Sequence, residues 1–352
     1  MAPSRIAGDV LRTPDAQLSP GAIALPDLPS PVRPRQGPPG RDGRGRSDRG
    51  SVRSLLVTLL ALALVAGACG NESESGEASR ESPKGAPTTL RIGLVPNVAP
   101  EEQRTKYEPF ARYLRERLGV KVELTVATNY AGTVRALEAG QLDLAYLGGL
   151  TYVQARERTK IEPLVTEVDR ETGQREYLSQ IVTKADSGVS KLEDLAGKDF
   201  AFGDPSSTSG SLYPRAMLVD AKFNCSATTL ESCPPLGRVL YSGGHDAAAQ
   251  AVAKGQVAAA GIEARILHRL QKEGKVPNDL KVLSERKVMG YPWVSPTSLD
   301  QAFRQRLTEA FQDIQDPALL DLLRAKSYVA VTAEDYKEVD ELARTLGLLT
   351  TG

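Results

Sequence analysis

Residues 129–148, NYAGTVRALEAGQLDLAYLG, and residues 244–263, GHDAAAQAVAKGQVAAAGIE, align over their whole length without a gap. In both, a helical pattern ends at a Gly-Gln pair, and an apolar strand pattern follows it. The alignment places Tyr130 opposite His245, each at the start of its helix. Helix-glycine-strand units are common, so chance could produce such a match. As a repeat, it predicts two lobes whose helix starts bring Tyr130 and His245 to one ligand from opposite sides.

Strand and helix patterns alternate on both sides of these units, which predicts an α/β fold with a largely parallel sheet in each lobe. Strands are expected at 89–96, 121–127, 142–148, 177–184, 199–204, 238–243 and 257–264. Helices are expected at 101–119, 131–140, 246–255, 299–314, 318–328 and 333–347. We assign lobe 1 to residues 90–182 and lobe 2 to residues 183–285, and residues 286–352 return to lobe 1 as C-terminal helices.

A run of hydroxyl residues lies within residues 203–214, GDPSSTSGSLYP, directly before a helical pattern. A helix N-terminus offers free backbone N–H groups and a partial positive charge, which together favour an anion. Ser207, Thr208 and Ser209 add hydroxyl donors there, a set that suits a tetrahedral oxyanion better than a planar carboxylate. A helix cap within a turn explains the same residues, so the run alone leaves both interpretations open.

His245 is one of only two histidines, and it lies between a strand and a helix. Its ring can donate to an anion in the neutral or the charged state, although a simple helix-terminal role would also fit. The sequence contains no phosphate-binding loop, no H-E-x-x-H and no G-x-S-x-G motif. A phosphoester hydrolase using Ser207 or Ser209 with His245 as base is therefore a less favoured alternative, and we expect no catalysis, metal or cofactor.

The segment from Leu55 to Ala68 is apolar, too short to span a bilayer comfortably, and preceded by an arginine-rich stretch. Its end, AGAC, resembles a bacterial lipoprotein signal, in which Cys69 would become the lipid-bearing N-terminus. An ordinary cleaved signal is the alternative. Residues 1–68 are thus predicted to be leader and signal peptide, and residues 69–89 a flexible tether. The folded part would lie outside the cytoplasm, attached to the membrane by lipid.

Cys225 and Cys233 stand eight positions apart in a turn-rich stretch. Outside the cytoplasm such a pair is expected to form a disulfide, and the metal alternative lacks nearby His or further Cys. Subtracting the nine Arg and five Asp of residues 1–68 from totals of 44 basic and 44 acidic residues leaves 35 and 39. This slightly acidic remainder offers no basic stripe for nucleic acid.

The motifs DLAYLGGLTYV, LEDLAGKDFAFGDPSSTSG, GGHDAAAQAVAKGQVAAA and YPWV, in this order, resemble the phosphonate-, phosphite- and phosphate-binding proteins of ABC transporters. The resemblance extends from Leu90 to about Leu349. It implies the periplasmic-binding protein type II fold, in which two lobes joined by crossing segments close on a ligand. It also implies that the phosphoryl oxygens are held by Ser207, Thr208, Ser209, His245, Tyr130 and Tyr152.

The sequence departs from the family where phosphonate binders often carry an aspartate in a PNDPW element. Here the stretch is VMGYPWV, with Gly290 and Tyr291 at that place. Glu263 could still meet an amine. Without the aspartate, we expect a small anion such as phosphite, phosphate or methylphosphonate, with Tyr291 beside its fourth substituent.

Together these features predict a substrate-binding lipoprotein of an ABC importer that captures a small phosphorus oxyanion in an interlobe cleft. It would act as a monomer on the outer face of the cell membrane and deliver its ligand to a permease and its ATPase. Hinge motion is expected in two crossing segments, 177–184 and 283–294. A ligand-sensing partner of a membrane signalling receptor is the alternative.

Overall fold

The computed structural model describes residues 85–225 and 229–349. These residues fall within one compact unit, Ser75–Gly352. The predicted leader, signal core, Cys69 and most of the tether lie outside the described residues. Within the described ranges, no helix is both long and apolar enough to cross a membrane.

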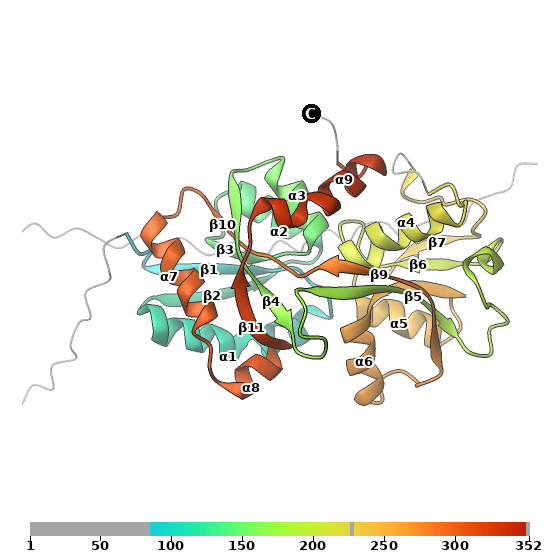
Figure 1. Cartoon of the computed structure of the whole chain (residues 1–352), viewed down its shortest axis with the longest axis horizontal. Coiled ribbons are helices and arrows are strands. Elements are labelled where there is room, and N and C mark those ends of the chain that lie inside the picture. The colour runs from blue at the N-terminus through green and yellow to red at the C-terminus, as the bar shows by residue number, and fades with distance from the viewer. Residues whose placement is uncertain (1–84, 226–228, 350–352) are drawn as a thin grey trace, which may run out of the picture. The chain divides into compact units, whose positions relative to one another are not determined.

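Lobe 1 is built on a six-stranded sheet in the order β11-β4-β10-β3-β1-β2 (Figure 1). Its elements before lobe 2 are β1 (Thr89–Leu94), α1 (Pro100–Leu118), β2 (Lys121–Val126), α2 (Tyr130–Glu138), β3 (Leu144–Tyr146), α3 (Gly149–Arg156) and β4 (Ile161–Asp169). Its elements after lobe 2 are β10 (Trp293–Pro296), α7 (Gln301–Gln312), α8 (Pro317–Leu322), β11 (Ala325–Ala330), η4 (Ala333–Tyr336) and α9 (Lys337–Thr345).

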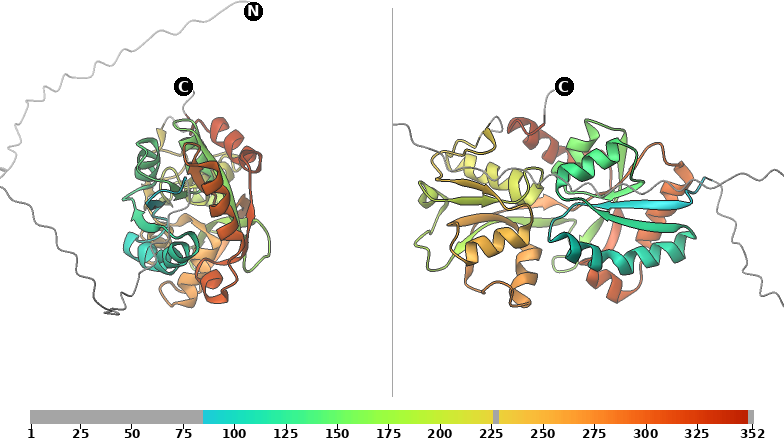
Figure 2. Two further views of the ribbon diagram at one scale, coloured as in Figure 1. Left: turned by 90° about the vertical axis from the view of Figure 1, so that its left-hand side faces the viewer. Right: turned by 180° about the vertical axis from the view of Figure 1, so that it is seen from behind.

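Lobe 2 is built on a five-stranded sheet in the order β7-β6-β8-β5-β9. Its elements are β5 (Glu176–Lys184), η1 (Leu192–Leu195), β6 (Phe200–Phe202), η2 (Thr208–Leu212), α4 (Tyr213–Asp220), β7 (Val239–Tyr241), α5 (His245–Ala253), β8 (Ala259–Glu263), α6 (Ala264–Lys272) and β9 (Leu280–Met289). Figure 2 shows α4, in yellow, on one face of this sheet and α5 and α6, in orange, on the other. Separate apolar clusters fill the two faces.

The sheets are mixed rather than largely parallel. Strands β2, β1 and β3 run parallel in lobe 1, as do β7, β6 and β8 in lobe 2. The remaining pairs are antiparallel. They include the pairs of β5, β9 and β10, the strands that flank the connections between the lobes. The parallel trios are the parts that the strand-helix alternation predicts.

The predicted helix at 318–328 is wrong in its second half. Helix α8 ends at Leu322, and β11 begins at Ala325 and pairs antiparallel with β4. Arg324 has a φ of 57°, in the left-handed region, which directs the chain out of the helix and into the strand. Pairing with an existing strand outweighs the local helical pattern.

The lobes are joined where β4 leads into β5 and where β9 leads into β10. Strands β5 and β9 pair with each other along their length in the five-stranded sheet of lobe 2. The connections between the two sheets therefore fall at residues 170–175 and 290–292. The sheet boundary therefore lies before Glu176, earlier than the predicted division at 182/183. In Figure 1, β5 starts at the junction with lobe 1, and β9 ends there.

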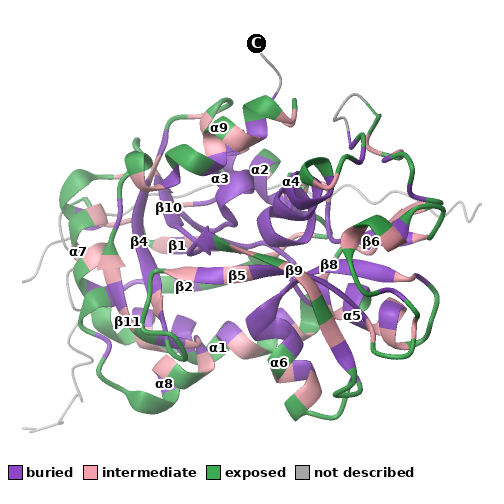
Figure 3. Ribbon diagram, turned by 45° about the vertical axis from the view of Figure 1, so that its right-hand side comes forward, coloured by how far each residue is buried: buried purple, intermediate pink, exposed green. Residues whose placement is uncertain are grey.

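Buried side chains continue from lobe 1 into this junction. The large lobe 1 core includes Tyr177 and Tyr213 from lobe 2, together with Tyr291 of the second connection. Conversely, Val98 of lobe 1 packs in the lobe 2 cluster around α5 and α6. Figure 3 shows buried residues extending through the strands of both sheets, whereas the outer faces of α1 and α7 are exposed. The two lobes therefore meet over a buried surface, and the candidate site lies there.

Candidate functional site

The two repeat units begin their helices at equivalent residues. Tyr130 is the first residue of α2 and His245 the first residue of α5, as the gapless alignment predicts. Both tyrosine and histidine are buried, each about 1% exposed. The His245 ring lies against Gly210, whose hypothetical Cβ would come within 3.0 Å of the His245 Cε1 atom. The repeat thus contributes one polar side chain from each lobe to a shared buried region.

The hydroxyl run lies at the start of a buried helix. Ser207 precedes a π-helical turn, Thr208–Leu212, which leads directly into α4. Single π-helical turns are rare and often occur at functional sites. Gly203 and Gly210 approach closely here, since a Cβ on Gly210 would lie 3.2 Å from Gly203 Cα and 2.9 Å from Ser207 Oγ. Glycine at 210 is therefore required by packing within the turn.

Each of the three hydroxyl oxygens already accepts one hydrogen bond from the protein. Ser207 Oγ accepts from the Gly210 N–H at 3.0 Å, and Thr208 Oγ1 accepts from the Leu150 N–H at 2.9 Å. Ser209 Oγ accepts from the Tyr177 hydroxyl at 3.2 Å. A hydroxyl that accepts in this way keeps its own hydrogen free to donate. The run therefore has three buried hydroxyl groups whose oxygens are held by the protein.

His245 is held in a single tautomer. Its Nδ1 accepts a hydrogen bond from the backbone N–H of Glu263 at 3.3 Å. The ring hydrogen of the neutral imidazole must then lie on Nε2, which is buried and has no partner among the described residues. Burial lowers the pKa of His245, although the nearby Glu263 carboxylate opposes that effect. The side chain is thus a neutral donor with one free N–H.

The Tyr130 hydroxyl is a further buried donor. Its oxygen has no partner of good hydrogen-bond geometry within the described part of the chain. Burial and the Asp204 carboxylate raise its pKa well above the ordinary value, and the nearby Ser207 side chain opposes them, so the hydroxyl stays protonated. The backbone N–H of Tyr130 is already occupied, because it donates to Asp204 Oδ2 at 3.2 Å. The first N–H of α2 is therefore capped by Asp204 of the other lobe.

Several hydrogen bonds join the lobes around these residues. Three backbone N–H groups of lobe 1 donate to side-chain oxygens of lobe 2: Ala99 to Asp246 at 3.3 Å, Tyr130 to Asp204 at 3.2 Å, and Leu150 to Thr208 at 2.9 Å. Gly148 permits the last approach, because a Cβ there would lie 2.8 Å from Thr208 Oγ1. The described arrangement is therefore one in which the lobes are in contact around the site.

Tyr152 is not brought to this group. Its ring packs edge-on against Tyr336 at 5.1 Å and lies under the Arg156 guanidinium at 5.6 Å, between α3 and the C-terminal segment. Burial raises its pKa, and Arg156 is the nearest charge that opposes this effect. Within the described residues, no hydrogen bond links Tyr152 to the hydroxyl run. Tyr336 and Arg156 both belong to lobe 1.

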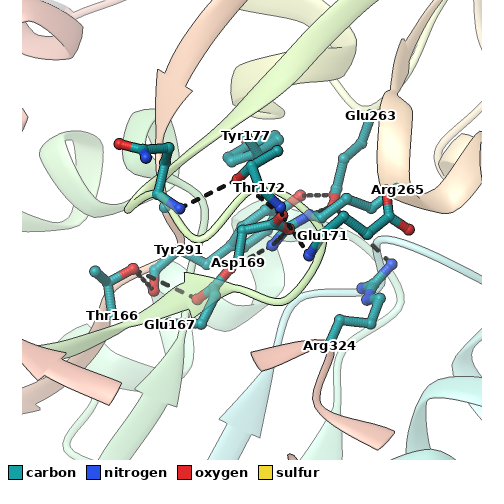
Figure 4. Close-up of polar contacts among 12 residues, drawn as sticks. Thr166, Glu167, Asp169, Glu171, Thr172, Tyr177, Glu263, Arg265, Tyr291 and Arg324 are labelled. Carbon is teal, nitrogen blue, oxygen red and sulfur yellow. Dashed lines mark hydrogen bonds and ion pairs between the residues drawn. The ribbon is translucent and has the colours of Figure 1, made fainter. Parts of the chain in front are cut away.

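Glu263 lies at the end of β8, where two guanidinium groups neutralise it (Figure 4). Arg265 Nε donates to Glu263 Oε1 at 2.7 Å, and Arg324 Nη1 of lobe 1 lies 4.0 Å from the same oxygen. Burial acts to raise the pKa of Glu263, but the charges of Arg265 and Arg324 outweigh it and hold that pKa below its ordinary value. Glu263 is therefore an ionised carboxylate that the protein itself already pairs.

Arg265 extends this network across the first connection between the lobes. Its Nη1 lies 3.0 Å from Glu167 Oε1 and 3.4 Å from Asp169 Oδ2, both on β4 of lobe 1. The guanidinium also lies 4.6 Å from the centre of the Tyr177 ring. Asp169 in turn accepts from the Glu171 and Thr172 N–H groups of the connecting turn (Figure 4). The charges thus connect Glu263 to the connection between β4 and β5.

Tyr291 is a partner of Glu263. Its hydroxyl donates to Glu263 Oε2 at 2.8 Å, and its ring stacks on Tyr146 with centroids 4.9 Å apart. Burial raises the pKa of Tyr291 well above its ordinary value, so the hydroxyl remains a donor. Packing leaves no room for a side chain at Gly290, because a Cβ there would lie 2.4 Å from Thr166 Oγ1 and 2.7 Å from the Arg175 carbonyl oxygen. A glycine at 290 is thus explained by the close approach of the two connections.

Sequence reasoning did not identify Asp204, Tyr177, Arg265 and Arg324. Asp204 had a local signal, since the sequence GDPSS is typical of an aspartate that hydrogen-bonds the backbone of its own turn. Tyr177 and the two arginines have no such signal, because their partners come from distant parts of the chain.

The structure joins Cys225 and Cys233 as a disulfide with Cα atoms 4.1 Å apart. The pair closes a short loop after α4, in lobe 2. Elsewhere in residues 85–225 and 229–349, no group of three His, Cys, Asp or Glu side chains could hold a metal ion.

Comparison with known proteins gives a consistent picture. Residues 92–336 match the family described as the periplasmic substrate-binding protein of ABC phosphonate transporters. The phosphate-import protein PhnD of Mycolicibacterium smegmatis is 34% identical over 196 residues, covering 55% of this chain and 60% of that protein. The probable phosphite-binding protein PhnD1 of Prochlorococcus marinus is 25% identical over 277 residues, covering 74% of this chain and 90% of the relative.

Among solved structures, Prochlorococcus marinus PhnD1 in complex with methylphosphonate superposes with a TM-score of 0.66 at 24% identity. The match covers 74% of this chain and 99% of that one, so the two-lobe fold is shared. The family match extends over most of the described residues and includes both lobes and the candidate site. The chain belongs to the family of periplasmic substrate-binding proteins of ABC phosphonate transporters.

Proposed function

We propose that the protein captures a small phosphorus oxyanion between its lobes and delivers it to the permease and ATPase of an ABC importer. The observation that carries this proposal is the set of donors with free hydrogens at the lobe junction: Ser207, Thr208, Ser209 and His245 Nε2. Two relatives are named as a phosphate-import protein and a probable phosphite-binding protein, and these names support the same class of ligand. Membership of a transporter family favours uptake over the sensing alternative.

We further propose that the ligand carries no ammonium group. Glu263 was the candidate partner for an amine, but Arg265 and Arg324 already neutralise it. An aminoalkyl substituent placed beside Glu263 would be repelled by the guanidinium groups of Arg265 and Arg324. Arg265 also pairs with Glu167 and Asp169, so Arg324 contributes most of this repulsion. Phosphate, phosphite and methylphosphonate avoid this repulsion. Hydrogen bonds to a charged group contribute about 1.5–3 kcal/mol each, so several of them reach micromolar affinity, roughly −8 kcal/mol, after the costs of closure.

The His245 tautomer argues against the hydrolase alternative. A histidine that activates serine must have an unprotonated nitrogen facing the hydroxyl. Here Nδ1 is the unprotonated nitrogen, and it is occupied by the Glu263 N–H. The remaining Nε2–H can donate but cannot accept a proton. We therefore propose a binding protein without catalysis. We also propose that it works as a monomer outside the cytoplasm and is attached to the membrane by lipid on Cys69.

Calorimetry with the full chain in detergent tests this proposal. Phosphate, phosphite and methylphosphonate are titrated separately, with 2-aminoethylphosphonate as the cationic comparison. We expect at least one of the three simple anions to bind with about micromolar affinity, and the amine to bind at least about tenfold more weakly. Absence of binding by all four would overturn the proposed function. Tightest binding of the amine would overturn the proposed ligand class.

A further inference from the structure

Asn97 is a buried carboxamide with no hydrogen-bond partner. Asn97 comes three residues after the end of β1 in lobe 1, and it is 1% exposed. Neither Oδ1 nor Nδ2 of its side chain forms a hydrogen bond among residues 85–225 and 229–349. Buried polar groups are nearly always paired, and leaving one unpaired costs about 1–3 kcal/mol. An amide that offers both a donor and an acceptor without using either is thus a group that a ligand could satisfy.

Asn97 lies directly beside the site. Its backbone carbonyl oxygen accepts a hydrogen bond from the backbone N–H of His245 at 3.0 Å, across the junction between the lobes. The next residue, Val98, packs in the lobe 2 core, and the Ala99 N–H donates to Asp246. Residues 97–99 therefore cross over to the start of α5, the helix that carries His245. In α/β sheets, ligands bind at the carboxyl ends of the strands, which is where Asn97 stands relative to β1.

The donors at the site leave a particular need unmet. Ser207, Thr208 and Ser209 each accept a protein hydrogen bond and are left with a hydrogen to donate, and His245 presents Nε2–H. Such donors suit the ionised oxygens of an anion. A phosphorus oxyanion that keeps one proton also has a P–OH group, and this group needs an acceptor. Asn97 Oδ1 is a buried acceptor without a partner among the described residues, and it belongs to a residue whose backbone hydrogen-bonds to His245.

We propose that Asn97 is a specificity residue of the anion site: its Oδ1 accepts the hydrogen of a P–OH group, while its Nδ2 donates to a neighbouring oxygen. This inference rests on the proposed function. The site thereby takes a protonated phosphorus oxyanion and discriminates against fully ionised tetrahedral anions such as sulfate, which have no hydrogen to donate. A site that hydrogen-bonds one group rejects an analogue lacking it, because a buried polar atom is left unpaired.

The ligands themselves allow a sharp prediction of pH dependence. Methylphosphonate carries one P–OH as a monoanion and none as a dianion, whereas phosphate still carries one as a dianion. Binding through Asn97 Oδ1 therefore predicts that methylphosphonate affinity falls as the pH is raised through its second ionisation. Phosphate affinity should stay nearly constant over the same range.

The test is calorimetry on the full chain in detergent, using phosphate, methylphosphonate and sulfate. Wild type is compared with Asn97→Leu, which removes both polar atoms, and with Asn97→Asp, which has nearly the same shape and keeps the acceptor. We expect Asn97→Leu to lose at least about tenfold in phosphate affinity, to bind phosphate and sulfate more equally, and to lose the pH dependence with methylphosphonate. Asn97→Asp should keep discriminating against sulfate.

Several outcomes would overturn the inference. If Asn97→Leu prefers phosphate to sulfate as strongly as wild type does, and keeps the pH dependence of methylphosphonate affinity, Asn97 does not hydrogen-bond to the P–OH group. If Asn97→Leu does not fold, loss of sulfate discrimination in Asn97→Asp would have the same meaning. Both results leave the proposed function intact, provided that wild type binds phosphate. If wild type binds no phosphorus anion, the proposed function fails first.

Discussion

The backbone N–H of Glu263 donates to Nδ1 of His245, 3.3 Å away, and this one bond determines how the histidine can act. It connects the last residue of β8 to the first residue of α5 within lobe 2. The hydrogen of the neutral ring is placed on Nε2. The same Glu263 pairs through its carboxylate with Arg265 and approaches Arg324 of lobe 1. Backbone and side chain of Glu263 thus shape the donor and the charge of the site together.

The neutral state of His245 predicts a pH-dependent contribution to stability. Burial lowers its pKa below the ordinary value of about 6.5, so the unfolded chain binds a proton more readily than the folded chain. The contribution is intact above about pH 6.5 and is lost as the pH falls from there through the folded pKa. Wild type should lose more melting temperature between about pH 7.5 and 5.5 than His245→Gln does.

His268→Gln is the matched control for that prediction. His268 is the other histidine, and its side chain is 52% exposed beside Glu171. His268→Gln removes an exposed imidazole outside the lobe junction, so the loss of melting temperature in His245→Gln is compared with the loss in this variant as well as in wild type. An equal loss in wild type and His245→Gln would contradict the buried neutral state.

Removing two hydroxyls of the run should abolish stabilisation by ligand. The double variant Ser207→Ala with Thr208→Ala loses two of the three hydroxyl groups, at a cost of about 1 kcal/mol to the helix start from the lost cap. In wild type, ligand at about 100 times its Kd should stabilise the fold by about 2.7 kcal/mol. Thermal melts with and without phosphate measure this shift. Ser187→Ala, whose hydroxyl bonds to the Lys184 carbonyl in the turn after β5, should retain it, and an undiminished shift in the double variant would exclude the hydroxyl run from the site.

Arg324 should control the response to amines. In Arg324→Gln, one of the two charges near Glu263 is removed, so the carboxylate is less completely neutralised. We expect affinity for 2-aminoethylphosphonate to rise relative to methylphosphonate by at least about fivefold. Arg170→Gln removes an exposed arginine that pairs with Asp321, and the affinity ratio should not change. A constant ratio in both variants would rule out charge compensation as the cause of selectivity.

Glu102 should slow the release of ligand. It lies on α1 of lobe 1 and pairs with Arg269 at 2.5 Å and Lys275 at 3.4 Å, both in lobe 2. These residues border a hollow of about 780 Å³ that also reaches Arg324. Part-exposed ion pairs contribute about 0.2–1 kcal/mol, so Glu102→Gln should speed dissociation about two- to fivefold in stopped-flow experiments at low salt.

Glu273→Gln is the control for Glu102. Glu273 pairs with the same Arg269 and Lys275, but all three belong to lobe 2. This variant removes an equal charge without breaking a contact between lobes, so its dissociation rate should match wild type. Equal acceleration in both variants would mean that local charge, rather than an interlobe contact, sets the rate.

The lipid anchor can be tested by fractionation of cells. Replacing Cys69 with Ser removes the only acceptor that the lipoprotein-like signal provides. We expect the variant to lose its membrane association and to appear in the soluble extracytoplasmic fraction. Ser73→Ala, close to Cys69 in the tether, is the control and should remain associated with membranes. Persistent association of the Cys69 variant would contradict the anchor.

The sequence was informative where neighbouring residues act together. The hydroxyl run is contiguous, and the repeat carries its own register, so Ser207–Ser209, Tyr130 and His245 could be predicted and placed on helix starts. The two parallel strand trios follow from the same local patterns.

The remaining features depend on distant parts of the chain. Arg324 approaches Glu263 from another lobe, 61 positions away, and no local pattern indicates that pairing. The same holds for β11, whose strand conformation depends on β4, and for Tyr152, whose helix directs it toward Tyr336. Asn97 could not be singled out, because an isolated asparagine after a strand is typical of an ordinary turn.

A crystal structure of the protein with phosphate or methylphosphonate bound would locate the anion itself. We expect one anion at the lobe junction, with oxygens within hydrogen-bond distance, about 2.6–3.2 Å, of the three hydroxyls of Ser207–Ser209 and of His245 Nε2. Arg265 should remain paired with Glu263 in that complex. An anion held instead by arginine or lysine side chains elsewhere, with the hydroxyl run and His245 not in contact with it, would exclude the proposed site.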